Sequence, residues 1–112
     1  MKPLEQNSVP RQSERRRAPR YPFDAVLEME WGSAVLQGRV RNISAGGMFV
    51  ELDNPLWVGA NFTARLSLDN PLRLDCGVRR VEPGRGMGLA FITPDRENQA
   101  QLANLLETLE KK

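Results

Sequence analysis

A cluster of arginines near the start of the chain has the chemistry of an anion receptor. Four guanidinium groups fall within six consecutive residues, in the segment Arg15-Arg16-Arg17-Ala18-Pro19-Arg20. The segment is too short and too charged to form part of a core. Arginine binds phosphate, or the acceptor edge of a purine, through two parallel hydrogen bonds. Taken alone, however, a run of this kind is most often a solvated basic tail.

A second short stretch supplies a turn that carries polar side chains. It reads Asn42-Ile43-Ser44-Ala45-Gly46-Gly47. Asn and Ser side chains can bond to nearby backbone, and the two glycines allow a positive φ or a close approach of the main chain to a ligand. Such a turn alone is most often a connecting loop. Together, the two stretches indicate a two-part site for an anionic ligand.

The charge of the chain is uneven. Of the 112 residues, 1–20 carry six basic and two acidic side chains, a net charge of +4, whereas 21–112 carry a net charge of −2. The basic character therefore belongs to the N-terminal segment. A surface that coats nucleic acid in general is not indicated.

Catalytic and metal chemistry are not indicated by the side chains present. The chain has no histidine, and no pairing of nucleophile and base, clustered carboxylates or metal-ligand spacing is apparent. We therefore predict neither an enzyme nor a metal or other cofactor. The single cysteine, Cys76, lies between apolar residues of an expected strand and is predicted to be a buried thiol.

The same inventory favours a cytoplasmic protein. A lone cysteine cannot form an internal disulfide, which is compatible with a reducing compartment. Residues 1–20 have no apolar region of a signal peptide. No apolar run approaches the roughly 18 residues that a membrane span needs. We expect a soluble protein in the cytoplasm.

The apolar residues predict a mainly β fold in one domain. Residues 1–14 are expected to be a disordered arm, and residues 15–112 to form the domain, with the arginine motif at 15–20 and a barrel over 21–93. Apolar side chains alternate with polar ones, as in half-buried strands, most clearly in Phe62-Thr63-Ala64-Arg65-Leu66-Ser67-Leu68. Val81 falls on the opposite parity from Val78, which predicts a β-bulge between Gly77 and Arg80.

The periodicity changes near the end of the chain. A helix is expected over 94–110, with Thr93 as N-cap and Pro94 in the first helical position. Four leucines then follow helical spacing and are expected to face either the core or a partner: Leu102, Leu105, Leu106 and Leu109. We therefore predict a small six-stranded antiparallel β-barrel with a C-terminal α-helix that covers or plugs one end.

This order of elements, with both motifs in place, resembles the PilZ domain family. The resemblance covers about residues 15–110. The family's Arg-x-x-x-Arg corresponds to Arg16-Arg17-Ala18-Pro19-Arg20, and its Asp/Asn-x-Ser-x-x-Gly corresponds to Asn42–Gly47. The segment Gly88-Leu89-Ala90-Phe91 is similar to the family's last barrel strand.

The resemblance implies a ligand, the bacterial second messenger cyclic di-GMP. Arg16 and Arg20 would then reach guanine acceptors or phosphate oxygens, with the geometry that arginine uses to read guanine in DNA. Asn42 would bond to a guanine edge, and Ser44 would contact a phosphate or a base. Gly46 and Gly47 would let the backbone come close. Asn42 is the family's permitted alternative to Asp and accepts with one oxygen only.

The resemblance also bears on how many ligand molecules bind. An arginine at position 15 resembles members that take an intercalated pair of cyclic di-GMP molecules, for which Arg15 and Arg17 would supply positive charge. Some members add an aromatic or basic residue from a later strand, and here Arg79 and Arg80 are the candidates. Trp31 and Trp57 could stack on bases, although Trp31 falls on the core-facing parity of its strand.

We therefore expect a stand-alone signalling effector whose arm, residues 11–20, closes over cyclic di-GMP and alters the binding of a downstream protein partner. One alternative is an adaptor that binds proteins without a ligand. A second is nonspecific RNA or DNA binding by the arm, which would depend steeply on salt. The sequence gives neither the partner, the process controlled nor the oligomeric state.

Overall fold

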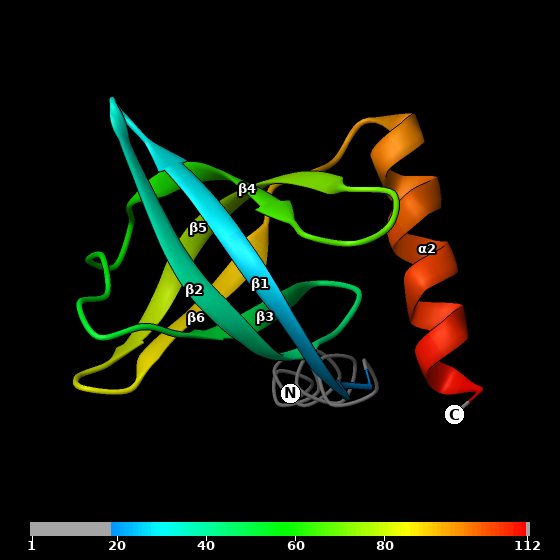
Figure 1. The fold of residues 1–112 in the computed structure, drawn as a ribbon, viewed down its shortest axis with the longest axis horizontal. Coiled ribbons are helices and arrows are strands. Elements are labelled where there is room, and N and C mark those ends of the chain that lie inside the picture. The colour runs from blue at the N-terminus through cyan, green and yellow to red at the C-terminus, as the bar shows by residue number, and fades with distance from the viewer. Residues whose placement is uncertain (1–18, 112) are drawn as a thin grey trace, which may run out of the picture.

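Six antiparallel strands close into a barrel, with one helix beside it (Figure 1). The computed structural model describes residues 19–111. Around the barrel the strands follow the order β1-β2-β3-β6-β5-β4. Their bounds are β1 Tyr21–Trp31, β2 Ala34–Ile43, β3 Gly47–Glu51, β4 Asn61–Leu66, β5 Leu72–Glu82 and β6 Gly86–Phe91. The predicted fold class is confirmed. The expected arm over 1–14, with Arg15, Arg16 and Arg17, lies outside the described residues.

The inward side chains of all six strands form the core of the barrel. On β4, Phe62, Ala64 and Leu66 are buried while Thr63 and Arg65 are not, as the alternation predicts. The largest fully buried side chains are Leu27, Met29, Ile43, Met48, Leu66, Leu72 and Met87. Cys76 is buried among them, and this burial raises the pKa of its thiol to about 12. The thiol is thus neutral and shielded, as predicted for a core cysteine.

Single extra residues interrupt the alternation on two strands. In the pairing of β5 with β6, Val78 faces Leu89 and Arg80 faces Gly88, so that Arg79 is the extra residue of a bulge. This confirms the bulge predicted between Gly77 and Arg80. A second bulge lies on β2, where Val40 faces Val50 and Asn42 faces Phe49, which leaves Arg41 unpaired. Each bulge puts two consecutive side chains on the outer face of the barrel.

The helix α2, Arg96–Glu110, lies beside the barrel next to the loop between β4 and β5 (Figure 1). Gln101 ties it there by donating to the backbone oxygens of Asn70, at 3.1 Å, and Pro71, at 3.2 Å. Leu102 of the helix is buried as part of the hydrophobic core, and the other three leucines are partly buried against that core. In residues 19–111 no helix is long and apolar enough to cross a membrane.

The helix begins two residues later than predicted, and its N-cap is Asp95 instead of Thr93. Asp95 has extended backbone angles, and its carboxylate accepts a hydrogen bond of 2.8 Å from the backbone N–H of Asn98. Asp is the stronger capping residue because its charge also complements the positive end of the helix dipole. Pro94 therefore precedes the cap instead of occupying the first turn.

Replacing Asp95 with alanine should lower the free energy of unfolding by about 1 kcal/mol, because the amide of Asn98 loses its acceptor. Urea unfolding followed by circular dichroism measures this change. Asp95→Asn is the matched control, since asparagine caps about as well as aspartate, and it should keep most of the stability. Equal stability of the alanine variant and the unchanged protein would contradict this role of Asp95.

Candidate ligand site

The structure brings together the described parts of the two motifs. Arg20 lies just before β1, and its Nε donates a hydrogen bond of 2.9 Å to Oδ1 of Asn42 near the end of β2. Its Nη1 lies 3.4 Å from Oγ of Ser44. These contacts form because Tyr21 pairs with Ile43, which places the start of β1 beside the end of β2. Residues from two sequence motifs thus meet on one face of the barrel.

The bulge at Arg41 explains why Asn42 faces outward. Val40 and Ile43 are both fully buried although three positions separate them, so the two residues between them lie on the outer side. Without the extra residue, strict alternation would make position 42 an inward position. The bulge therefore delivers the amide of Asn42 to the surface, where Arg20 reaches it.

Ser44 builds the turn between β2 and β3. Its backbone N–H donates to the carbonyl oxygen of Gly47 at 2.8 Å, and its hydroxyl donates to the same oxygen at 3.3 Å. Its Oγ also accepts from the N–H of Gly46 at 3.3 Å. Ser44 is only 3% exposed. Its predicted contact with a phosphate or a base stays a prediction, and that contact would require one of these bonds to be exchanged.

The two glycines of the turn have different roles. Neither has a positive φ, so this turn does not use the backbone freedom that glycine allows. Gly47 is buried against β6, and a methyl group added there would overlap the carbonyl oxygen of Leu89. Gly46 is exposed, and no atom outside its chain neighbours lies within 4 Å of an added methyl. The close approach at Gly47 is thus to a neighbouring strand.

An outward-facing aromatic ring lies next to Asn42. Phe49 pairs with Asn42 on one side and with Gly88 on the other, and Gly88 in turn pairs with Arg80. Its neighbours Met48 and Val50 point into the core, so the ring points outward. Yet Phe49 is only 6% exposed. The guanidinium carbons of Arg80 and Arg85 lie 5.9 and 5.7 Å from the ring centre, and these side chains cover it.

A shallow hollow of about 150 Å³ joins these groups. Its lining consists of Arg20, Asn42, Phe49, Arg80, Glu82 and Arg85. Three guanidinium groups face one carboxylate, so the lining has an excess of positive charge and suits an anion. Of the two later-strand candidates, Arg80 lies in this lining and Arg79 does not.

Sequence reasoning missed three residues of the hollow, namely Phe49, Glu82 and Arg85. Phe49 belongs to the uninterrupted apolar run Met48-Phe49-Val50, in which alternation cannot tell the inner face from the outer one. Glu82 and Arg85 flank a Pro-Gly turn and resemble ordinary surface charges. The spacing of Val40 and Ile43 was the available signal for the bulge on β2, and it matches the signal that revealed the bulge on β5.

Beside the hollow, charges on β1, β2 and β3 neutralise one another. Arg39 contacts Asp24 at 2.6 Å, and Arg41 lies 3.9 Å from Asp24 and 3.5 Å from Glu51. The hydrogen bond from Arg39 holds the pKa of Asp24 below its usual value. The positive excess is therefore concentrated at Arg20, Arg80 and Arg85.

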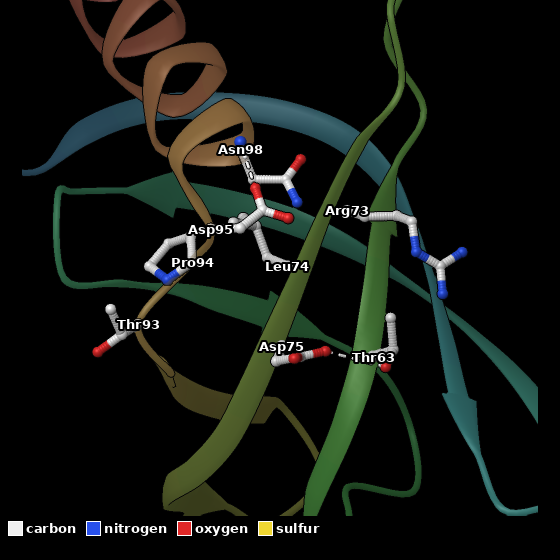
Figure 2. A pocket seen from close by; sticks show the side chains of 8 residues that line it. All are labelled: Thr63, Arg73, Leu74, Asp75, Thr93, Pro94, Asp95 and Asn98. Carbon is white, nitrogen blue, oxygen red and sulfur yellow. Dashed lines mark hydrogen bonds between the residues drawn. The ribbon is translucent and has the colours of Figure 1, made fainter.

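A roomier pocket, of about 460 Å³, lies between β4, β5 and the start of α2 (Figure 2). Figure 2 shows the Asp75 carboxylate, which accepts a hydrogen bond of 3.0 Å from the Thr63 hydroxyl, and Asp95, which accepts one from the backbone N–H of Asn98 and so caps the helix. Asp75 and Asp95 thus already accept hydrogen bonds, and no predicted ligand residue lines the pocket. Within residues 19–111, no group of three His, Cys, Asp or Glu side chains could hold a metal ion. The hollow at Arg20 is thus the better candidate for a ligand site.

Comparison with known families identifies the family of the chain. Residues 14–108 match the model of the PilZ domain, and both motifs of this chain fall within that range. The chain belongs to the PilZ domain family. No curated protein sequence matches the chain significantly.

Solved PilZ domains share the fold. The PilZ domain of CeSA from a cellulose-synthesizing bacterium has a TM-score of 0.70 and 24% identity, over 83% of this chain and 99% of that one. The PilZ domain of YcgR from Escherichia coli, solved with c-di-GMP, has a TM-score of 0.71 and 19% identity, over 87% and 92% of the two chains. The inhibitor of motility MotI from Bacillus subtilis has a TM-score of 0.70 and 19% identity, over 86% of this chain and 52% of that one.

The glycine pair of this PilZ domain provides a matched test. Gly47→Ala should lower the free energy of unfolding by about 2 kcal/mol or more, because the methyl group forces β3 away from β6. Gly46→Ala, one residue away in open space, should change it by less than about 0.5 kcal/mol. Urea unfolding of both variants measures the difference. Equal stabilities would show that the close packing at Gly47 carries no cost.

Proposed function

We propose that this PilZ domain is a cyclic di-GMP receptor that signals by altering the binding of a protein partner. The observation that carries the proposal is the bonded pair Arg20 and Asn42, which unites the described parts of both motifs beside a cationic hollow. Membership of the PilZ family supports it. So does the likeness of the fold to the YcgR domain solved with c-di-GMP.

Arg20 is the central residue of the proposed site. A guanidinium group has five N–H donors, and Arg20 directs Nε to Asn42 and Nη1 to Ser44. Its side chain is exposed, so the remaining donors are accessible to phosphate oxygens or to O6 and N7 of a guanine. Asn42 holds the guanidinium plane in place, and its own NH2 group is left to bind a base edge or a phosphate. In this proposal Arg80 adds a third donor across the ring of Phe49.

The hollow alone is too small for the ligand. Pockets that bury a drug-sized molecule hold about 300–1,000 Å³, whereas this hollow holds about 150 Å³. The proposed site is therefore completed by the arm, residues 11–20. Four residues of chain span at most about 14 Å, so Arg16 is within reach of a ligand held by Arg20. Of the two glycines of the turn, the exposed Gly46 would let the ligand approach the backbone, whereas Gly47 packs against β6.

The energetics are compatible with a second-messenger receptor. Micromolar affinity corresponds to about 8 kcal/mol of binding free energy. Charge-assisted hydrogen bonds of about 1.5–3 kcal/mol each, together with stacking, can supply this after the cost of ordering the arm. Binding would replace loose positive charge with a neutralised, ordered surface, which a protein partner can distinguish from the free state.

Replacing Arg16 or Arg20 with alanine should weaken cyclic di-GMP binding by about 100-fold or more, because each change removes charge-assisted bonds to the ligand. Isothermal titration calorimetry measures the affinity. Arg65→Ala is the control, since it removes the same charge from the outer face of β4, where Arg65 pairs with Glu28 at 3.0 Å. Wild-type affinity in both arginine variants would refute the assignment. Absence of heat with the unchanged chain would favour the ligand-independent adaptor.

Arg15 is proposed to set the number of ligand molecules. An intercalated pair brings additional phosphate charge, so the pair needs more positive charge than a single ligand does. Arg15→Ala should therefore reduce the calorimetric stoichiometry from about two ligands per chain to about one, with little change in stability. A stoichiometry of one in the unchanged chain, or one that does not respond to the substitution, would contradict this role.

A further inference from the structure

We infer that Glu82 is a specificity-determining residue that competes with anionic ligands for Arg80 and Arg85. The inference rests on the proposed function, because it assigns a role within the same hollow. In the free protein the Glu82 carboxylate holds both guanidinium groups, as a ligand phosphate would when bound. The affinity of the site then reflects an exchange of one anion for another.

The contacts of Glu82 have the form of a bound anion. Its Oε1 lies 2.8 Å from Nη1 of Arg85, and its Oε2 lies 3.2 Å from Nη2 of Arg80. Each carboxylate oxygen thus holds a different arginine. The Glu82 side chain is 30% exposed, whereas those of Arg80 and Arg85 are 64% and 69% exposed. The arginines remain open to an incoming ligand while the carboxylate lies between them.

A tight turn constrains the backbone that carries Glu82 and Arg85. The chain from Glu82 to Arg85 forms a tight turn closed by a hydrogen bond of 2.9 Å from the N–H of Arg85 to the carbonyl oxygen of Glu82. Pro83 has a restricted φ, and Gly84 has a φ of 77°, as the central positions of a type II turn require. The turn therefore holds the backbones of Glu82 and Arg85 at a fixed separation, from which their side chains meet.

The competition between Glu82 and a ligand also determines how much of the Phe49 ring is exposed. Arg80 and Arg85 cover this ring in the free protein and leave 6% of the residue exposed. A phosphate that draws the guanidinium groups off the ring uncovers an apolar surface beside Asn42. A purine base can stack on that surface, whereas inorganic phosphate gains nothing from it. The arrangement therefore favours a nucleotide that carries both groups over a simple anion.

The strength of the competition is suited to a reversible switch. Exposed ion pairs change an equilibrium constant by about one- to fivefold each. Two such pairs lower the affinity by an amount that several charge-assisted bonds to a ligand can overcome. A role in the turn alone would instead leave ligand affinity unchanged when the charge of Glu82 is removed, because glutamine keeps the size of the side chain.

Titration calorimetry with cyclic di-GMP tests the inference. Glu82→Gln should raise the affinity by about three- to tenfold over the unchanged chain, because the ligand no longer displaces a carboxylate. Glu30→Gln removes the same charge from β1, ten residues along the chain from Arg20, and should leave the affinity unchanged. A urea unfolding curve for each variant confirms that it is folded. Inorganic phosphate, titrated in parallel, should bind far more weakly to every chain.

The same substitution made in a second variant, Arg85→Ala, separates the direct contact of Glu82 from the long-range effect of its negative charge. In Arg85→Ala, where the shorter ion pair is absent, Glu82→Gln should produce a smaller gain. A gain of unchanged size there, or equal gains from Glu82→Gln and Glu30→Gln, would overturn the inference. Binding by the unchanged chain with no gain in Glu82→Gln would overturn it and leave the proposed function intact. Absence of binding in every chain would overturn both.

Discussion

The candidate site depends on two places where one extra residue interrupts the alternation of a strand. A small closed barrel needs an apolar side chain at every second position, so that the side chains between them face outward. The extra residues Arg41 and Arg79 break this rule on strands that lie on either side of β3 and β6. As a result, Asn42 and Arg80 both point outward, with Phe49 and Gly88 between them in one row.

Several polar groups of the candidate site already have partners within the chain. Within residues 19–111, no buried side-chain nitrogen or oxygen lacks a hydrogen-bond partner. Arg20 donates to Asn42, and Glu82 holds Arg80 and Arg85. A ligand that binds Arg80 and Arg85 must therefore replace existing ion pairs, whereas Arg20 and Asn42 keep further donors for it. The affinity of the candidate site is therefore sensitive to small changes in charge.

Much of the fold could be predicted from the sequence because most of its strands alternate regularly. The bulge at Arg79 was predictable from the parity of Val78 and Val81, whereas the same spacing of Val40 and Ile43 was overlooked. The pairing of β3 with β6 could not be predicted, because it joins segments that are distant in the chain and equally apolar. The start of the helix was misplaced because Thr93 and Asp95 both fit an N-cap, and only the bond to Asn98 distinguishes them.

The residues of the candidate site that belong to a sequence motif could be predicted, whereas those brought there by packing of the strands could not. The two motifs predicted that Arg20 and Asn42 belong to one site, and the structure brings these two side chains into direct contact. Phe49 and Arg85 contribute only because the barrel brings β3 beside the turn between β5 and β6. Gly47 was expected to serve the ligand, yet the backbone of β6 accounts for the need for glycine there.

The bulge at Arg41 makes the site a matter of chain length as well as of residue identity. Loss of this one residue would leave Arg20, Asn42 and Phe49 chemically unchanged, but regular pairing would turn the asparagine amide toward the core. Insertions and deletions in β2 are therefore expected to be tolerated far less than substitutions on its outer face. During divergence, a one-residue length change in this strand would remove the asparagine amide from the candidate site while the barrel itself persists.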